Sequence, residues 1–151
     1  MREQRYHGLS IGLFPVLAVA LILLWRRRSF RVEVYGSSMS PTLEPGEYLF
    51  AVRTRSVRPG SLVVVEQPNW PGHEVVKRVE AGPGDRVGDG ILDRDEYWII
   101  GDNSDRSTDS RTFGPVRRAA IRGRVILRYW PLSRVTAFLG ASPPHPRGGR
   151  R

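Results

Sequence analysis

The most apolar part of the chain lies near its start. Residues 8–25 form an uncharged run of 18 residues, which is long enough to cross a bilayer as one helix. The segment WRRRSFR overlaps its end, and the chain offers no small-residue cleavage site there of the kind that ends a secretory signal. The pattern therefore predicts a retained N-terminal membrane anchor over residues 1–29, with its span at residues 8–25.

Beyond residue 30 the hydrophobic pattern changes to short β-type runs separated by glycine and proline. The runs are RVEVYG, EYLFAVR, SLVVVEQ, EVVKRVEA, EYWIIGD and IRGRVILRYW. Such spacing is typical of a compact all-β domain, which we assign to residues 30–139. Residues 140–151 have too little apolar content to pack and are predicted to form a disordered basic tail.

The formal net charge of +9 raises nucleic acid and anionic lipid as partners. Much of the excess lies in Arg26, Arg27, Arg28 and Arg31 beside the apolar run, and in the basic tail. This distribution fits membrane flanks and a solvated tail. The expected partner is therefore the lipid bilayer, through residues 8–25, and no nucleic acid is expected.

Composition also excludes several kinds of chemistry. The chain has no cysteine, so it has no disulfide, thiolate nucleophile or thiolate metal site. Its three histidines, His7, His73 and His145, do not stand at ligand spacing from one another. We therefore expect no metal and no other cofactor.

Lys77 is the only lysine among the 24 basic residues. Arginine stays protonated in proteins, whereas a buried lysine can lose its proton and act as a base. In a strand over EVVKRVEA, Lys77 would share an apolar face with Val75 and Val79, while Arg78 points the other way. Burial would then lower the pKa of the amine toward the range of a general base. The alternatives are a lysine kept by chance, or one at a sheet edge with its amine in solvent.

Two polar segments add candidate chemistry. Residues 36–47, GSSMSPTLEPGE, form a turn that presents the hydroxyls of Ser37, Ser38 and Ser40, although its composition alone fits an ordinary polar turn. Residues 101–116, GDNSDRSTDSRTFGPV, are too polar for a strand, and no register meets the ligand pattern of a calcium loop. We interpret the second segment as a hydrogen-bonded loop whose charged groups orient another residue.

Together, the segments SMSPTL, VVKRV with GPGD, and GDNSDRSTDSRTFGPV resemble the three conserved motifs of the signal peptidase I family, in the family's order and behind an N-terminal anchor. The resemblance covers about residues 36–125. The details STDSR, FGPV, GRV and RYWPL look most similar to the short branch of nickel-type superoxide dismutase maturation proteases. The segment from Arg78 to Gly101 is too short for the inserted β-domain of some bacterial members, so the resemblance implies a minimal catalytic core.

The resemblance implies a compact, all-β, signal-peptidase-like fold without a metal, and a Ser–Lys dyad instead of a Ser-His-Asp triad. Ser38, directly before Met39, matches the family's nucleophile, and Lys77 matches its general base. Many members have a serine two places before the nucleophile, where this chain has Gly36. The oxyanion hole is therefore expected to use backbone N–H groups of the Gly36 region, such as that of Ser38.

Five further residues match supporting positions of the family. Ser107 matches a serine that hydrogen-bonds the lysine amine. Asp109 and Arg111 match a structural ion pair, and Asp102 matches the partner of Arg78. The resemblance thus implies that these residues orient the lysine and hold the site together.

The predicted function is that of a membrane-anchored serine endopeptidase that removes N-terminal leader or pro-peptides. The resemblance implies a precursor polypeptide with small residues before the cut, and we expect it to bind as an added β-strand beside the strand that leads to Ser38. One alternative is a dedicated maturation protease of a nickel superoxide dismutase precursor. An alternative of another class is a non-enzymatic basic membrane protein that binds nucleic acid or anionic lipid.

The chain is expected to be a single-pass protein of a bacterial cell membrane. Four arginines at residues 26–31 follow the apolar run, against Arg2, Arg5 and the terminal amine before it. By the positive-inside rule this balance favours a cytoplasmic catalytic domain, although both flanks carry positive charge. A cytoplasmic domain would fit the maturation protease, and an external domain would fit the signal peptidase.

Overall fold

The structure is a computed structural model that describes residues 13–140. Within them it has two α-helices, α1 at Leu13–Arg28 and α2 at Ser110–Phe113, and 3-10 turns at Ser104–Arg106, Arg118–Ala120 and Leu132–Arg134. The strands are β1 Ser29–Glu33, β2 Tyr48–Val52, β3 Leu62–Glu66, β4 Glu74–Ala81, β5 Arg86–Val87, β6 Gly90–Ile91, β7 Glu96–Ile100, β8 Val116–Arg117, β9 Ile121–Trp130 and β10 Thr136–Ala137.

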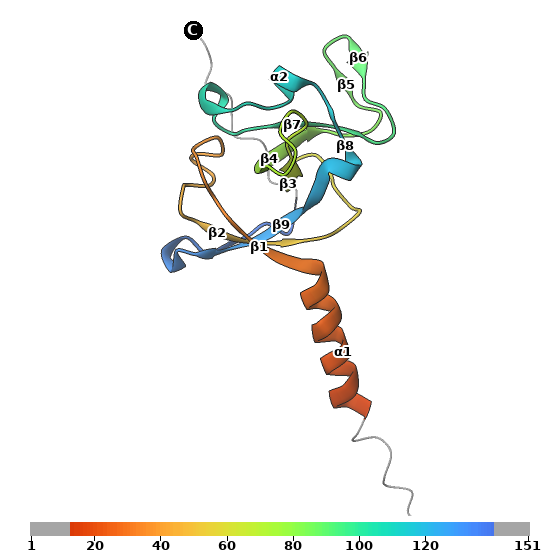
Figure 1. The fold of residues 1–151 in the computed structure, drawn as a ribbon, viewed down its shortest axis with the longest axis vertical. Helices are drawn as coiled ribbons and strands as arrows, with labels where there is room; N and C mark the ends of the chain where they lie inside the picture. The colour runs from red at the N-terminus through yellow and green to blue at the C-terminus, as the bar shows by residue number, and fades with distance from the viewer. Residues whose placement is uncertain (1–12, 141–151) are drawn as a thin grey trace, which may run out of the picture.

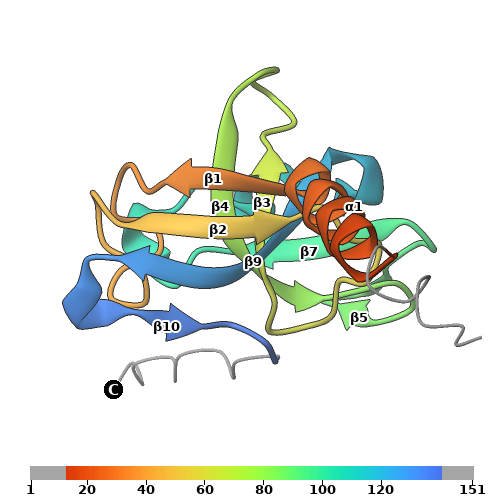
Figure 2. The same cartoon turned by 90° about the horizontal axis from the view of Figure 1, so that it is seen from below.

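Eight strands form one antiparallel sheet in the order β1-β2-β9-β3-β4-β7-β8, with β10 added to β9, while β5 and β6 form a separate short hairpin. The long strand β9 pairs with β3 along its first half and with β2 from Arg124 onward, and register shifts interrupt both pairings. Such irregularities increase the local twist, and the sheet curls into an open half-barrel from which α1 projects (Figures 1 and 2). The prediction of an all-β domain is confirmed in part, because the described domain is mostly β but also contains the short helix α2 and three 3-10 turns.

The sheet is buried on both faces at β3. Leu62 and Val64 belong to one apolar core, whereas Val63 and Val65 belong to a second. Successive side chains of a strand point to opposite faces, so the two cores lie on opposite sides of the sheet. This explains why residues 62–65, LVVV, are continuously apolar instead of alternating.

Apolar side chains hold the serine-rich loop between β1 and β2 against the sheet. Met39 and Leu43 lie in the first core with exposed fractions of 2% and 0%. The N–H of Leu43 donates to the carbonyl of Met39 at 2.9 Å, which closes one turn of the loop. Ser38 is therefore carried by a segment that is anchored immediately after it.

A buried ion cluster fastens the end of this loop to β9. Arg128 donates from Nη1 to Glu47 Oε2 at 3.0 Å, and both residues are buried. Arg134 Nη1 lies 3.0 Å from Glu47 Oε1, close enough for an ion pair although not aligned as a hydrogen bond. Arg128 also donates to the Thr42 carbonyl at 2.7 Å and to the Thr136 hydroxyl at 2.9 Å. The cluster thus ties the loop to β9 at two points, Thr42 and Glu47.

Helix α1 leaves the sheet at β1, and many of its apolar side chains are exposed, including those of Phe14, Leu17 and Leu23. Near its end, the Trp25 ring stacks on Phe50 of β2 with centroids 5.5 Å apart. Among residues 13–140, no helix combines the length and the apolar character needed to cross a membrane. The predicted span starts at residues 8–12, which lie outside the described residues, as does the predicted tail from residue 141 onward.

We expect Arg128→Met to destabilise the fold by about 3 kcal/mol, because it removes a principal partner of a buried carboxylate. Urea denaturation of the full chain in detergent measures the free energy of unfolding. Arg94→Met is the control, because Arg94 is exposed, and it should change that free energy by less than about 0.5 kcal/mol. Equal effects of the two substitutions would contradict the role of the cluster.

Candidate active site

Ser38 lines a cleft of about 200 Å³. Residues 32–36, 38 and 39 line one part of the cleft. Residues 73–76, around the start of β4, line another part, and Val64 of β3 also contributes. Two residues before the serine, Gly36 has a φ of 78°, a left-handed conformation that glycine adopts without steric cost. Ser38 itself is half-buried, so its side chain is placed to meet a ligand in the cleft.

Lys77 lies in β4 directly opposite Val63 of β3, and only 2% of it is exposed. Val63 and Val79 belong to the second core, and Lys77 shares their face of the sheet because cross-strand partners and alternate residues lie on one side. The amine donates a hydrogen bond to Ser107 Oγ at 2.9 Å. The lysine is thus buried among apolar groups with a hydroxyl as its hydrogen-bond partner.

The surroundings of Lys77 favour a neutral amine. Burial has the largest effect and lowers the pKa of Lys77 from its usual 10.5, because the ammonium ion loses hydration. The charge of Asp109 opposes this effect and raises the pKa, while the charge of Arg111 lowers it. Arg111 therefore limits the extent to which Asp109 keeps the amine protonated.

A hydrogen-bonded chain continues from Ser107 to Arg111. Ser107 Oγ donates to Asp109 Oδ2 at 2.7 Å, and Arg111 donates to the same carboxylate from Nε at 2.8 Å and from Nη2 at 2.6 Å. Burial raises the pKa of Asp109, but the hydrogen bonds from Arg111, the Gly101 N–H and Ser107 together outweigh it and lower the pKa from 3.8 to about 2. Because the ionised Asp109 accepts the Ser107 hydrogen, the Ser107 oxygen is left to accept from Lys77.

Gly101, the first residue after β7, lets two parts of the site approach closely. A Cβ added there would lie 2.2 Å from Ser107 Oγ and 2.5 Å from the Ser38 carbonyl oxygen. Its N–H donates to Asp109 Oδ2 at 2.8 Å, and the Asn103 N–H donates to the Ser38 carbonyl at 3.0 Å. The loop after β7 therefore joins the segment of Ser38 to the partner of Lys77, and it does so only with glycine at position 101.

Arg78 and Asp102 form a second link between β4 and this loop. Arg78 Nε donates to Asp102 Oδ1 at 2.8 Å and Nη2 to Oδ2 at 2.7 Å, which is a bidentate pair with both side chains buried. A third nitrogen, Nη1, donates to the Gly60 carbonyl at 3.1 Å. Arg78 lies opposite Leu62, on the face of the sheet away from Lys77, so it braces the loop without contacting the amine.

The arrangement can activate a hydroxyl as a nucleophile. A neutral lysine that donates one N–H to Ser107 keeps a lone pair with which to accept a proton. Within residues 13–140 no hydrogen bond joins Ser38 Oγ to Lys77 Nζ, and such catalytic contacts often form only when substrate binds. In the same part of the chain, no group of three or more possible metal ligands occurs.

His73 is a competing base, because it lines the same cleft. Its ring is exposed and stacks on Trp70 with centroids 4.8 Å apart. No described carboxylate hydrogen-bonds the ring, so His73 lacks the partner that orients a catalytic histidine.

Two features of the site were missed by sequence reasoning. The role of Gly101 had a clue in the sequence, since a glycine directly after a strand can mark a close approach of the backbone to another group. Glu47 and Arg128 had none, because 81 positions separate them.

The chain matches one peptidase family and several curated proteins. A profile described as "Signal peptidase, peptidase S26" matches residues 9–91 and 88–130. The "Mitochondrial inner membrane protease subunit 1" of Homo sapiens is 33% identical over 122 residues, which cover 72% of this chain and 73% of that protein. The subunit 1 of Xenopus tropicalis is 39% identical over 111 residues, 64% of this chain and 66% of that protein. The subunit 2 of Danio rerio is 32% identical over 165 residues, which cover 95% of this chain and 87% of that protein.

We expect the amine of Lys77 to titrate below 10.5, and Arg111→Gln to raise its pKa, because the charge of Asp109 would then act without the opposing charge of Arg111. Isotope-labelled lysine places a single label in the chain, so an NMR titration of the full chain reports on Lys77 alone. Arg111→Lys should stay near the wild-type value. Arg117→Gln removes the same charge from an exposed position and should leave the pKa unchanged; a shift equal to that of Arg111→Gln would contradict a local effect.

Gly101→Ala should lower the rate of peptide cleavage by about a hundredfold or more, because the added methyl group forces Ser38 away from Ser107 and small misplacements have effects of this size. Gly90→Ala is the control, since its Cβ would meet nothing closer than 3.8 Å. Cleavage is compared at equal folded fractions, which tryptophan fluorescence measures. Full activity in a folded Gly101→Ala chain would show that this close approach is not needed.

Proposed function

The chain belongs to the signal peptidase S26 family and is a serine-type endopeptidase, and we propose that Ser38 and Lys77 are its catalytic dyad. The observation that carries the proposal is the environment of Lys77. Its amine is buried, its pKa is lowered by that burial, and its hydrogen-bond partner Ser107 is held against the Ser38 segment through Gly101. The non-enzymatic alternative is set aside, because it accounts for neither the family match nor this arrangement.

The reaction proceeds through an acyl-enzyme. Neutral Lys77 takes the proton of the Ser38 hydroxyl, and Ser38 Oγ attacks the carbonyl carbon of the scissile peptide bond. No described residue accepts a hydrogen bond from the Ser38 N–H. This N–H can therefore donate to the oxyanion, together with backbone groups of the Gly36 region. The Lys77 ammonium then gives its proton to the leaving amine. In the second half of the reaction a water gives a proton to the neutral Lys77 amine and attacks the ester carbonyl. Lys77 then returns that proton to Ser38 Oγ as the acyl group leaves, which restores the Ser38 hydroxyl.

The substrate binds extended between two free sheet edges. β1 is the outermost strand, and β4 pairs with β7 only from Arg78 onward. Both edges border the cleft through residues 32–36 and 73–76, so a peptide can add to them as a β-strand. The lining of the cleft includes Val32, Val34 and Val76. A cleft of about 200 Å³ suits the small residues that we expect before the cut.

Residues 8–25 anchor the domain in a membrane. The support is the uncharged run itself, the exposed apolar side chains of α1 and the relatives, which are described as mitochondrial inner membrane proteases. These relatives do not support the expected bacterial cell membrane. Arginines 26–28 and 31 favour a cytoplasmic domain by the positive-inside rule.

The physiological substrates are precursor polypeptides that lose an N-terminal leader or pro-peptide. The narrower resemblance to nickel-type superoxide dismutase maturation proteases is not supported by the relatives, which are inner membrane protease subunits. We therefore do not carry the nickel enzyme forward as the substrate.

Ser38→Ala and Lys77→Arg should each lower cleavage by at least about a thousandfold, because the first removes the nucleophile and the second keeps the charge but cannot act as a base. The measurement uses the full chain in detergent and a peptide with alanine before the cut. Ser37→Ala and His73→Gln are the controls and should retain cleavage.

Residual cleavage above a few per cent in Lys77→Arg would exclude the dyad. The same conclusion would follow if the wild-type rate tracked a group of pKa about 6.5, the value of histidine, and His73→Gln abolished it.

A further inference from the structure

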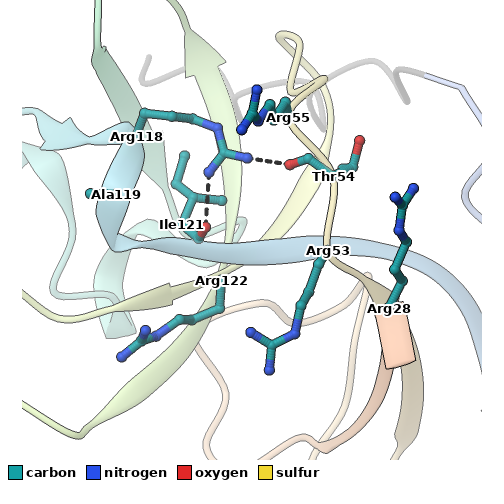
Figure 3. A pocket seen from close by; sticks show the side chains of 8 residues that line it. All are labelled: Arg28, Arg53, Thr54, Arg55, Arg118, Ala119, Ile121 and Arg122. Atoms are coloured by element: carbon teal, nitrogen blue, oxygen red, sulfur yellow. Dashed lines mark hydrogen bonds between the residues drawn. The ribbon is translucent and has the colours of Figure 1, made fainter. Parts of the chain in front are cut away.

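A second cavity, of about 670 Å³, lies where α1 meets the sheet (Figure 3). Of the eight described residues that line it, five are arginines and none is acidic. The arginines are Arg28, Arg53, Arg55, Arg118 and Arg122. They come from the end of α1, from the loop after β2, from the 3-10 turn before β9 and from β9 itself. We call this cavity the arginine pocket.

Two of these side chains are held in place by uncharged partners. Arg118 donates from Nη1 to the Ile121 carbonyl at 2.9 Å and from Nη2 to the Thr54 carbonyl, as Figure 3 shows. The guanidinium of Arg53 lies 5.6 Å from the centroid of the Phe30 ring, a cation–π contact. These contacts orient the guanidinium groups but leave their positive charge unbalanced.

Within the described part of the chain, one arginine of the pocket is paired with carboxylates. Arg122 forms an ion pair with Glu66 and lies 3.4 Å from Glu74. Among residues 13–140, no carboxylate forms an ion pair with any of the other four. The lining therefore carries more positive than negative charge, which is the character of a site that an anion completes.

The pocket is also placed beside the anchor helix. Arg28 is the last residue of α1, and its carbonyl accepts a hydrogen bond from the Arg53 N–H at 2.7 Å. Trp25 lies three residues earlier, about 4.5 Å along the helix axis, and its stack on Phe50 fixes the helix end against β2. A tryptophan at the end of an apolar helix lies at the level of lipid headgroups, so the pocket opens at that level.

We propose that the arginine pocket binds the phosphate group of an anionic phospholipid and so sets the position of the peptidase domain on the bilayer. The inference rests on the anchor in the proposed function. Guanidinium groups bind phosphate oxygens through paired, charge-assisted hydrogen bonds. A lipid fits better than a soluble phosphate or a nucleic acid, because the pocket adjoins an exposed apolar helix whose own last turn supplies Arg28.

The test measures binding of short-chain phosphatidylglycerol, below its micelle concentration, to the full chain in neutral detergent. Short-chain phosphatidylcholine and glycerol phosphate are the comparison ligands. We expect saturable binding of phosphatidylglycerol that weakens at least about tenfold in Arg53→Gln/Arg55→Gln, since two charge-assisted hydrogen bonds are lost. The control is Arg86→Gln/Arg94→Gln, which removes the same charge in and beside the β5–β6 hairpin, at the end of the domain opposite α1 (Figure 1).

Four results would overturn the proposal. They are no phosphatidylglycerol binding, equal losses in the two double variants, equal binding of glycerol phosphate, which would indicate a site for soluble phosphate, and tight binding of an oligonucleotide in place of the lipid. Binding should be unchanged in Ser38→Ala, and peptide cleavage in neutral detergent should be unchanged in Arg53→Gln/Arg55→Gln. These two controls distinguish failure of the lipid site from failure of the dyad. The anchor is tested separately, because a membrane-spanning chain should resist extraction from the membrane at alkaline pH.

Discussion

The burial of one primary amine is the constraint on which the rest of the site depends. Lys77 is almost fully enclosed, yet its hydrogen-bond partner is the hydroxyl of Ser107 and not a carboxylate. A carboxylate in direct contact would stabilise the ammonium form and hold its proton. Ser107 lies between the Lys77 amine and the Asp109 carboxylate. Asp109 fixes the direction of the Ser107 hydroxyl, while Arg111 balances much of the charge of Asp109.

This arrangement lowers the stability of the fold at neutral pH. The folded-state pKa of Lys77 lies below 10.5, so between the two values the folded chain binds fewer protons than the unfolded chain. Stability therefore rises with pH through that interval, and the whole penalty is present below the folded-state pKa. Asp109, in contrast, stabilises the fold when it is ionised. Its contribution is complete above 3.8 and is lost as the pH falls to about 2.

The long strand β9 connects the arginine pocket to the loop that carries Ser38. Its first residues, Ile121 and Arg122, line the arginine pocket, and Arg128 near its other end holds the Ser38 loop through Glu47. A paired strand transmits position well, because its backbone hydrogen bonds fix its register against both neighbours. A domain seated by the pocket would therefore present its cleft at a fixed height above the bilayer.

The sequence by itself determined the β-rich domain, the family and the placement of its only lysine on an apolar face. These follow from local regularities, since strand periodicity, turn residues and ordered motifs are all written in short segments. It did not determine the length of α1, which ends at Arg28 after 16 described residues.

Only the tertiary structure decided which distant groups meet. The contact of Gly101 with Ser38 and Ser107, the Glu47–Arg128 pair and the arginine pocket each join segments that come together through the strand order and curl of the sheet. The physical reason is that the periodicity of side chains along a strand predicts the face of the sheet on which a residue lies. The residue that it contacts on that face depends on which distant strands pair and in what register.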